Sequence, residues 1–368
     1  MPFIRDAKMY YRPTSLRLKD SIKQVGSPVL DALGVFNRSI ERVRADASVW
    51  TILMYHRVTR DTSDDPFGLG MCVRLSYFEE QIAYLQRHFA VLPVDDVVQR
   101  LARGEPLPPA TLSITFDDGY LDNLLLAQPV LERYGLPWSL YVTTGGLEDA
   151  RPFWWDRTIR AVAATRAERL DLDGLPEAFG TGSLSLSGAA RRGTVEHLLD
   201  KLWALPIART LVCVQAIEER LLRGVADSEG PQAPRMSPAQ LNDLAGRPGV
   251  SIGAHTVRHP NLNLLPGDEV GWEMSASRQA LENLLQRPVH GFVYPGGRMN
   301  AEVVELARAA GFRYALSTES HLNLLPADPL CLGRVGMPDA NVADFRRSLH
   351  TLAQRVLNRH VHTHGSGA

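Results

Sequence analysis

Apolar and polar positions follow two periods along this chain, and the two periods alternate. Short apolar or β-branched runs are typical of buried strands, and they fall at residues 49–55, 91–92, 111–114, 138–142, 250–254, 291–294 and 314–317. Between them lie segments with helical spacing of apolar residues, at residues 76–89, 95–102, 121–134, 269–285 and 301–310. Strands that alternate with helices predict a parallel α/β sheet or barrel.

Two of the predicted helices begin with capping signals. Ser76 followed by Glu79 predicts a capping box ahead of one helix. Ser237 and Pro238, with Gln240, predict another helix start with proline at the first helical position. A last short strand is expected near residues 332–335.

The alternation is confined to the middle of the chain, and this divides the sequence. We expect an N-terminal helical extension at residues 1–48, the barrel at 49–345, and a C-terminal helix and tail at 346–368. Residues 157–235 are rich in Ala, Leu and Arg and interrupt the alternation. They predict a helical insertion within the barrel.

Composition narrows the class of protein. The 368 residues are 45% hydrophobic and 22% charged, as in globular proteins, and a net charge of -1 gives no reason to expect a nucleic-acid partner. Three cysteines without a C-x-x-C pair argue against a disulfide framework and a thiolate zinc site. No apolar run suits a signal peptide or a membrane span. We therefore expect a cytoplasmic protein.

The first thirty residues carry more Lys and Arg than Asp. Such a basic segment predicts peripheral contact with an anionic membrane surface. The alternative is a solvated helical extension that packs loosely on the barrel.

Polar side chains collect at the ends of the predicted strands. They are His56, Asp117, Asp118, His255, Tyr294 and Arg334. In a barrel the carboxyl ends of the strands meet on one face, and that face carries the chemistry.

Asp117 and Asp118 end one strand side by side. Asp is disfavoured in strands, and adjacent like charges are costly to ionise together. A cation resolves both problems, because it holds one carboxylate while the other stays free as a base. The alternative is a plain Asp-Asp-Gly turn.

His255 and His259 are four residues apart. If the chain turns helically after the strand, both imidazoles lie on one face and can share a metal. With Asp118 they form a set of two histidines and one carboxylate that leaves positions open for water and substrate.

At these motifs the sequence resembles a known family. The segments are Thr115-Phe116-Asp117-Asp118-Gly119-Tyr120, His255-Thr256-Val257-Arg258-His259 and Tyr294-Pro295-Gly296-Gly297. They resemble the polysaccharide deacetylases, the NodB-homology or carbohydrate esterase family 4 group. Two more segments resemble the branch found in exopolysaccharide and glycolipid biosynthesis: Met54-Tyr55-His56-Arg57-Val58 and Trp154-Trp155-Asp156. The resemblance spans residues 49–335.

The resemblance implies a distorted (β/α) barrel and a metal-dependent hydrolase. Its substrate would be an N-acetylated amino sugar in a polysaccharide, an oligosaccharide or a lipid-linked glycan. Asp118, His255 and His259 would hold a divalent metal, usually zinc. Asp117 would be the general base, and the main-chain N–H of Tyr120 would help to bind the oxyanion.

Two residues typical of the family are missing here. The third motif lacks the arginine that orients the base, and Arg334 is our hypothesis for its replacement. The late Leu-x-His motif that supplies the acid has no clear match. His56 is our candidate for the acid or for an acetate-contacting residue, and His321 is a weaker one.

Aromatic residues near the motifs suggest a sugar-binding cleft. Trp154, Trp155 and Tyr294 offer flat faces to a pyranose ring, and Asp156 is a candidate substrate contact. For Trp154 and Trp155 the alternative is that they pack the insertion on the barrel.

Two other functions remain open at this stage. One is an amidase on the same scaffold that cleaves a small non-sugar amide, which the missing arginine keeps open. The other is a catalytically silent glycan-binding protein, against which the intact Asp117 and metal set argue.

Overall fold

The computed structural model describes residues 30–364 except 32–33 and 177–178. Most of the N-terminal helical extension expected at residues 1–48, with its basic segment, therefore lies outside the described residues. In the described part, α2 (Asn37–Ala45) packs beside α12 (Val342–His364). No described helix is both long enough and apolar enough to cross a bilayer.

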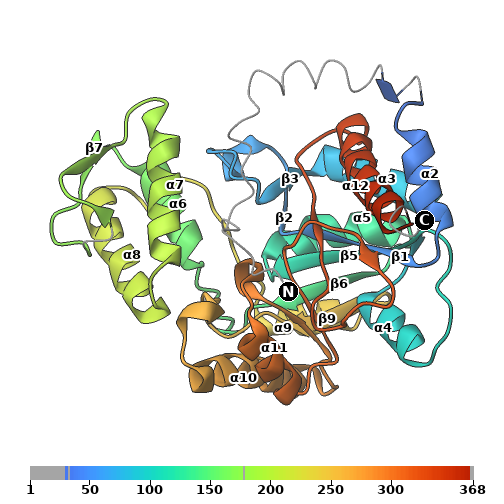
Figure 1. The fold of residues 1–368 in the computed structure, drawn as a ribbon. Coiled ribbons are helices and arrows are strands. Elements are labelled where there is room, and N and C mark those ends of the chain that lie inside the picture. The colour runs from blue at the N-terminus through green and yellow to red at the C-terminus, as the bar shows by residue number, and fades with distance from the viewer. Residues whose placement is uncertain (1–29, 32–33, 177–178, 365–368) are drawn as a thin grey trace.

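A curled, almost entirely parallel sheet forms the centre of the molecule (Figure 1). Its main strands, in spatial order, are β11 (Tyr314–Leu316), β10 (Gly291–Val293), β9 (Val250–Ala254), β6 (Trp138–Val142), β5 (Thr111–Asp118) and β1 (Val49–Tyr55). Short strands add to it at β4 (Ala90–Val91), β12 (Asn323–Leu324) and β13 (Val335–Gly336). Only β12 runs antiparallel to its neighbour, β1.

The residues around β13 bring the two ends of the sheet together. Leu332 forms a parallel bridge with Leu316 of β11, and Val335 pairs in parallel with Leu53 of β1. The sheet is thereby curled into a distorted barrel, which confirms the predicted fold class.

Helices cover the outside of the sheet. They are α3 (Leu75–His88), α5 (Gln128–Arg133), α9 (Pro238–Ala245), α10 (Gly267–Leu285) and α11 (Ala301–Ala309). In contrast, α4 (Val94–Ala102) packs against the opposite face, in the cluster that contains Trp50 and Ile52. Side chains of a strand alternate between two faces. On β1, Leu53 and Tyr55 join the large core between sheet and helices, whereas Trp50 and Ile52 join a smaller cluster on the other face.

Residues 157–235 contain three elements that Figure 1 shows to one side of the barrel: α7 (Ala190–Trp203), α8 (Ile207–Leu221) and most of α6 (Trp154–Ala164). They share a separate hydrophobic cluster. The segment is not wholly helical, because β7 (Arg169–Asp171) and β8 (Ser183–Ser185) form an antiparallel pair. Their alternation is too short to distinguish from a loop in the sequence.

The local predictions had mixed outcomes. The capping box at Ser76 was wrong, because α3 begins at Leu75 and its N-cap, Arg74, makes no side-chain cap. The helix start at Ser237 and Pro238 is confirmed, and the structure adds a capping box between Ser237 and Gln240. The helix expected at residues 121–134 contains a π-helical segment, Asn123–Ala127, which ends two residues before Pro129. Proline has no N–H to donate, so the regular ladder is interrupted there.

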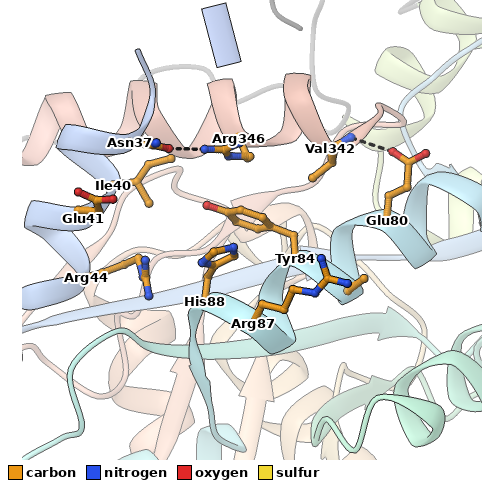
Figure 2. A pocket seen from close by; sticks show the side chains of 11 residues that line it. Asn37, Ile40, Glu41, Arg44, Glu80, Tyr84, Arg87, His88, Val342 and Arg346 are labelled. Atoms are coloured by element: carbon orange, nitrogen blue, oxygen red, sulfur yellow. Dashed lines mark hydrogen bonds between the residues drawn. The ribbon is translucent and has the colours of Figure 1, made fainter. Parts of the chain in front are cut away.

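Two pockets lie away from the strand ends that carry the polar residues. One of about 500 Å³ lies among α2, α3 and α12 and mixes Arg44, Arg87 and Arg346 with Glu41 and Glu80 (Figure 2). Another of about 820 Å³ is mainly apolar and is lined by α4 and the segment before Leu332. Neither is lined by any of the polar strand-end residues.

Candidate active site

The Asp117–Asp118 pair ends β5, and both carboxylates are buried. Asp118 has a left-handed backbone conformation, with φ of 76°, which is uncommon for a residue other than glycine. This conformation ends the regular alternation of the strand, and both carboxylates lie close to His255. Strained backbone of this kind concentrates at functional sites.

Asp118 and the two predicted histidines converge. Asp118 Oδ1 lies 3.6 Å from His255 Nε2 and 3.7 Å from His259 Nε2. One ligand atom from each of the three residues lies within 4.8 Å of the ligand atoms of the other two. Neither carboxylate oxygen of Asp118 has a hydrogen-bond partner in the described chain. A buried carboxylate without a partner is costly, so this donor set fits a divalent cation.

The protonation states of this cluster agree with that fit. Burial, and next the neighbouring Asp117, raise the pKa of Asp118 well above its usual value. Burial lowers the pKa of both His255 and His259, so both imidazoles are neutral. Metal ligands must be neutral imidazoles and ionised carboxylates, and a bound cation would restore the charge of Asp118.

The segment after β9 is not the helical turn that the four-residue spacing suggested. Thr256 and His259 have φ of 65° and 56°, which bends the segment back on itself. The N–H of His259 donates to Thr256 Oγ1 at 3.0 Å. Two left-handed residues, rather than a helix, therefore bring the second histidine to the first.

Glu273 of α10 holds this loop. Its buried carboxylate accepts hydrogen bonds from the N–H groups of Val257 and Arg258, at 2.8 and 3.0 Å, and from Arg258 Nε at 2.6 Å. Sequence analysis missed Glu273, because an acidic residue on an amphipathic helix carries no signal of such a role.

Asp117 pairs with Arg334, as hypothesised. The guanidinium donates to both carboxylate oxygens at 2.7 Å, and it also donates to Thr115 Oγ1 and to the carbonyl of Ser317. Burial raises the pKa of Asp117, but the Arg334 guanidinium overcomes this and holds it at about 2. Asp117 is thus ionised and oriented, and it stands outside the donor set of Asp118.

His56 lies beside Asp117 and is partly exposed to solvent. Its Nε2 is 3.9 Å from Asp117 Oδ2, and 20% of its side chain is exposed. Burial lowers its pKa to about 4, against the opposing effect of Asp117, so the imidazole is neutral at pH 7. His321 instead packs against Gly333 and lies 3.8 Å from Glu319.

Tyr120, Trp155 and Asp156 form one hydrogen-bonded chain. Trp155 Nε1 donates to Tyr120 Oη at 2.8 Å, and Tyr120 Oη donates to Asp156 Oδ2 at 2.9 Å. Tyr120 and Arg235 face each other in an antiparallel bridge, and its hydrogen bonds are made by the residues on either side of them. The main-chain N–H of Tyr120 takes no part in this bridge. The indole N–H of Trp155 and the carboxylate of Asp156 are therefore both hydrogen-bonded to Tyr120.

Tyr294 does not line a cleft. It is fully buried, its hydroxyl donates to the carbonyl of Leu330 at 3.0 Å, and its ring packs on Phe292. The prediction that its face is available to a sugar is therefore wrong. The apolar strand 291–294 simply continues into the core at this position.

Two further residues were missed because they lie in the insertion or at its end. Trp203 of α7 reaches His259, with ring centroids 5.7 Å apart. Arg235 donates to the carbonyls of Thr143 and Gly145 and stacks on Phe153 at 4.1 Å. It thereby ties the end of the insertion to the end of β6. Neither residue belongs to a recognisable motif.

The fold and the site together define a class of protein: a distorted α/β barrel with a two-histidine, one-carboxylate cluster beside an arginine-held carboxylate. A family model described as polysaccharide deacetylase matches residues 211–315, which include both histidines. YxkH of Bacillus subtilis strain 168, whose name assigns it to the polysaccharide deacetylases, is 20% identical over 76% of this chain and 71% of its own.

Solved structures show the same fold. The deacetylase PplD of Streptococcus pyogenes, solved with acetate, has a TM-score of 0.54 at 17% identity and covers 83% of this chain and 98% of its own. IcaB of Ammonifex degensii has a TM-score of 0.53 at 18% identity and covers 83% and 97%. Residues 211–315 thus match the polysaccharide deacetylase family model, and the fold of the chain is similar to that of solved deacetylases.

Proposed function

We propose that this protein removes N-acetyl groups from the amino sugars of a glycan, with a divalent metal, zinc, held by Asp118, His255 and His259. The observation that carries this proposal is the buried, unpartnered carboxylate of Asp118 beside two neutral imidazoles, with Asp117 next to it. Bound there, zinc would polarise the acetamido carbonyl and make water more acidic.

Asp117 is the general base of the proposed reaction. It is ionised at neutral pH and oriented by both nitrogens of Arg334. Each of its oxygens keeps a lone pair for the attacking water. Once protonated, a carboxyl group whose pKa is held low is a strong acid, so Asp117 can return the proton to the departing amine.

The remaining residues bind the developing charge and the acetyl group. The main-chain N–H of Tyr120 is unused by the bridge next to it and is our candidate donor to the oxyanion. His56 is neutral near pH 7, so we assign it a hydrogen bond to the acetamido group rather than delivery of the proton.

The glycan's identity is the finer part of the proposal. The bound acetate of PplD is the second product that N-deacetylation of a sugar releases. We propose a polysaccharide, oligosaccharide or lipid-linked glycan as substrate, met in the cytoplasm or at the membrane surface. The excess of basic residues in the N-terminal segment supports the surface location.

Acetate release tests the proposal. Purified protein is incubated with N-acetylated oligosaccharides, a lipid-linked N-acetyl sugar and small non-sugar amides, each with and without a chelator. We expect acetate from the sugars, loss of release on chelation and recovery with added zinc. Release only from small amides indicates the amidase, and glycan binding without release indicates a silent module.

Asp117→Asn is the matched control, because it keeps the donor set of Asp118, His255 and His259. It should bind zinc as the wild type does and release acetate about 10²- to 10⁴-fold more slowly. An Asp117→Asn variant with wild-type turnover would remove the proposed base.

A further inference from the structure

The two histidines of the donor set are held in different ways. His255 Nδ1 lies 2.8 Å from the carbonyl of Val293, so its N–H is bonded and its Nε2 faces the cluster. His259 Nδ1 is buried and forms no hydrogen bond with any residue of the described chain. A metal-binding histidine almost always donates its second N–H to a fixed acceptor.

Two indoles contact His259 where that acceptor is missing. The ring of Trp155 lies 4.5 Å from the imidazole, at an interplanar angle of 55°, and the ring of Trp203 lies 5.7 Å away at 49°. Their exposures are 1% and 7%, so both are fixed in packed surroundings. We call Trp155 and Trp203 the indole pair.

The members of the indole pair come from different parts of the chain. Trp155 lies in the first turn of α6 and is anchored by a hydrogen bond to Tyr120, just after β5. Trp203 ends α7, deep in the insertion, and stacks on Trp154 with centroids 6.3 Å apart. The insertion therefore reaches the donor set directly.

The Pro295-Gly296-Gly297 loop leaves room for Trp203. A Cβ on Gly296 would lie 2.7 Å from Trp203 Cζ2, closer than such contacts occur, and Gly296 has φ of 57°. Only glycine meets both conditions without displacement. This motif residue accommodates a side chain of the insertion.

We infer that Trp203 is a positioning residue for His259: its packed indole, with that of Trp155, holds the imidazole with Nε2 toward the cation in place of a hydrogen bond on Nδ1. The inference rests on the metal site of the proposed function, and it gives the insertion a part in that site. Loss of the indole would leave the ring free to turn, and the donor set would lose affinity rather than a ligand.

The test measures metal affinity, with no glycan present. The dissociation constant for zinc is determined by competition with a chromophoric chelator on the full-length wild type, Trp203→Ala and Trp203→Phe. We expect Trp203→Ala to weaken zinc binding about 10- to 100-fold, as loss of a ligand's supporting partner does. Trp203→Phe keeps a packed ring and should remain within about threefold of the wild type.

Leu198→Ala is the control for general damage to the insertion. Leu198 is fully buried on α7 in the insertion cluster, so its truncation should lower the melting temperature and leave the zinc constant unchanged. Unchanged affinity in Trp203→Ala, or an equal loss in Leu198→Ala, would overturn the inference.

The two proposals fail separately. A wild type that binds zinc but releases no acetate refutes the deacetylase function and leaves the indole pair to be judged on affinity alone. A wild type that binds no zinc refutes the metal site and the positioning role of Trp203 together.

Discussion

At the scale of single residues, the site depends on two buried carboxylates with opposite surroundings. Asp117 has a bidentate guanidinium and Asp118 has no partner in the described chain. Burial raises the pKa of both, and at Asp117 this effect is reversed, chiefly by Arg334. Two adjacent aspartates therefore have pKa values shifted in opposite directions, which suits them to different roles in the proposed reaction.

Replacing Arg334 should alter the pH dependence of the proposed reaction. In Arg334→Met the burial of Asp117 is no longer opposed, so its pKa rises and the base is protonated at higher pH. The acid limb of kcat/KM against pH should move upward by about 1–3 pH units. Arg334→Lys keeps the charge and should move it less. An acid limb that stays in place in Arg334→Met would show that Asp117 does not set it.

Replacing Asp118 should separate metal binding from stability. With the metal removed, Asp118→Asn should be more stable than the wild type at neutral pH by about 1–3 kcal/mol, because on folding the Asp118 carboxylate must either take up a proton or be buried charged, and the amide does neither. Added zinc should raise the melting temperature of the wild type and not that of the variant. Equal zinc shifts in both proteins would contradict the donor set.

At the scale of elements, the ends of strands and helices decide where the site residues lie. The loop after β9 carries both histidines. Its shape is set by residues with positive φ and by the Glu273 carboxylate on α10, not by helical spacing. Its geometry therefore depends on Glu273, which lies outside the motif.

Glu273→Ala should destabilise the protein and loosen its metal site together. The N–H groups of Val257 and Arg258 would lose their acceptor, which costs about 1–3 kcal/mol. Urea denaturation and zinc competition would show a lower free energy of unfolding and a weaker zinc constant. Glu273→Gln keeps one acceptor oxygen and should lie between; a larger loss in Gln than in Ala would contradict this account.

The two serines that the sequence marked as helix caps offer a matched comparison. Ser237 caps α9 in a capping box, so Ser237→Ala should lower the free energy of unfolding by about 1 kcal/mol. Ser76 lies inside α3 and makes no cap, so Ser76→Ala should leave it almost unchanged. Urea denaturation distinguishes the pair, and equal effects would mean that the cap is not the cause.

The sequence predicted most elements and the donor set, because both depend on local patterns. Strand alternation and the Asp-Asp and His-x-x-x-His motifs are visible over a few residues. The sequence could not show that Tyr294 turns into the core, or that Glu273 and Trp203 reach the histidines. Those contacts are set by packing between segments far apart in the chain.

At the scale of the whole molecule, buried charges join the insertion to the barrel. Asp156 of α6 accepts from Tyr120 of the barrel, and Arg57 of β2 (Arg57–Thr59) stacks on the same tyrosine ring at 5.1 Å. Burial raises the pKa of Asp156 to about 7, against the opposing effect of Arg57.

Asp156 should make the free energy of unfolding depend on pH. The pKa of Asp156 is higher in the folded than in the unfolded state, where it is about 3.9. Its favourable contribution is therefore full below about pH 4 and is lost as the pH rises toward 7. Asp156→Asn, compared with metal-free wild type, should gain more in melting temperature at pH 8 than at pH 5. A gain that is equal at both values would exclude this cause.

The closure of the barrel by β13 has a consequence for biosynthesis. Arg334 lies 217 residues beyond Asp117, so nearly all of the chain must leave the ribosome before the base acquires its counter-charge. A nascent chain that ends before Arg334 carries both motifs but lacks the guanidinium that orients Asp117 and lowers its pKa.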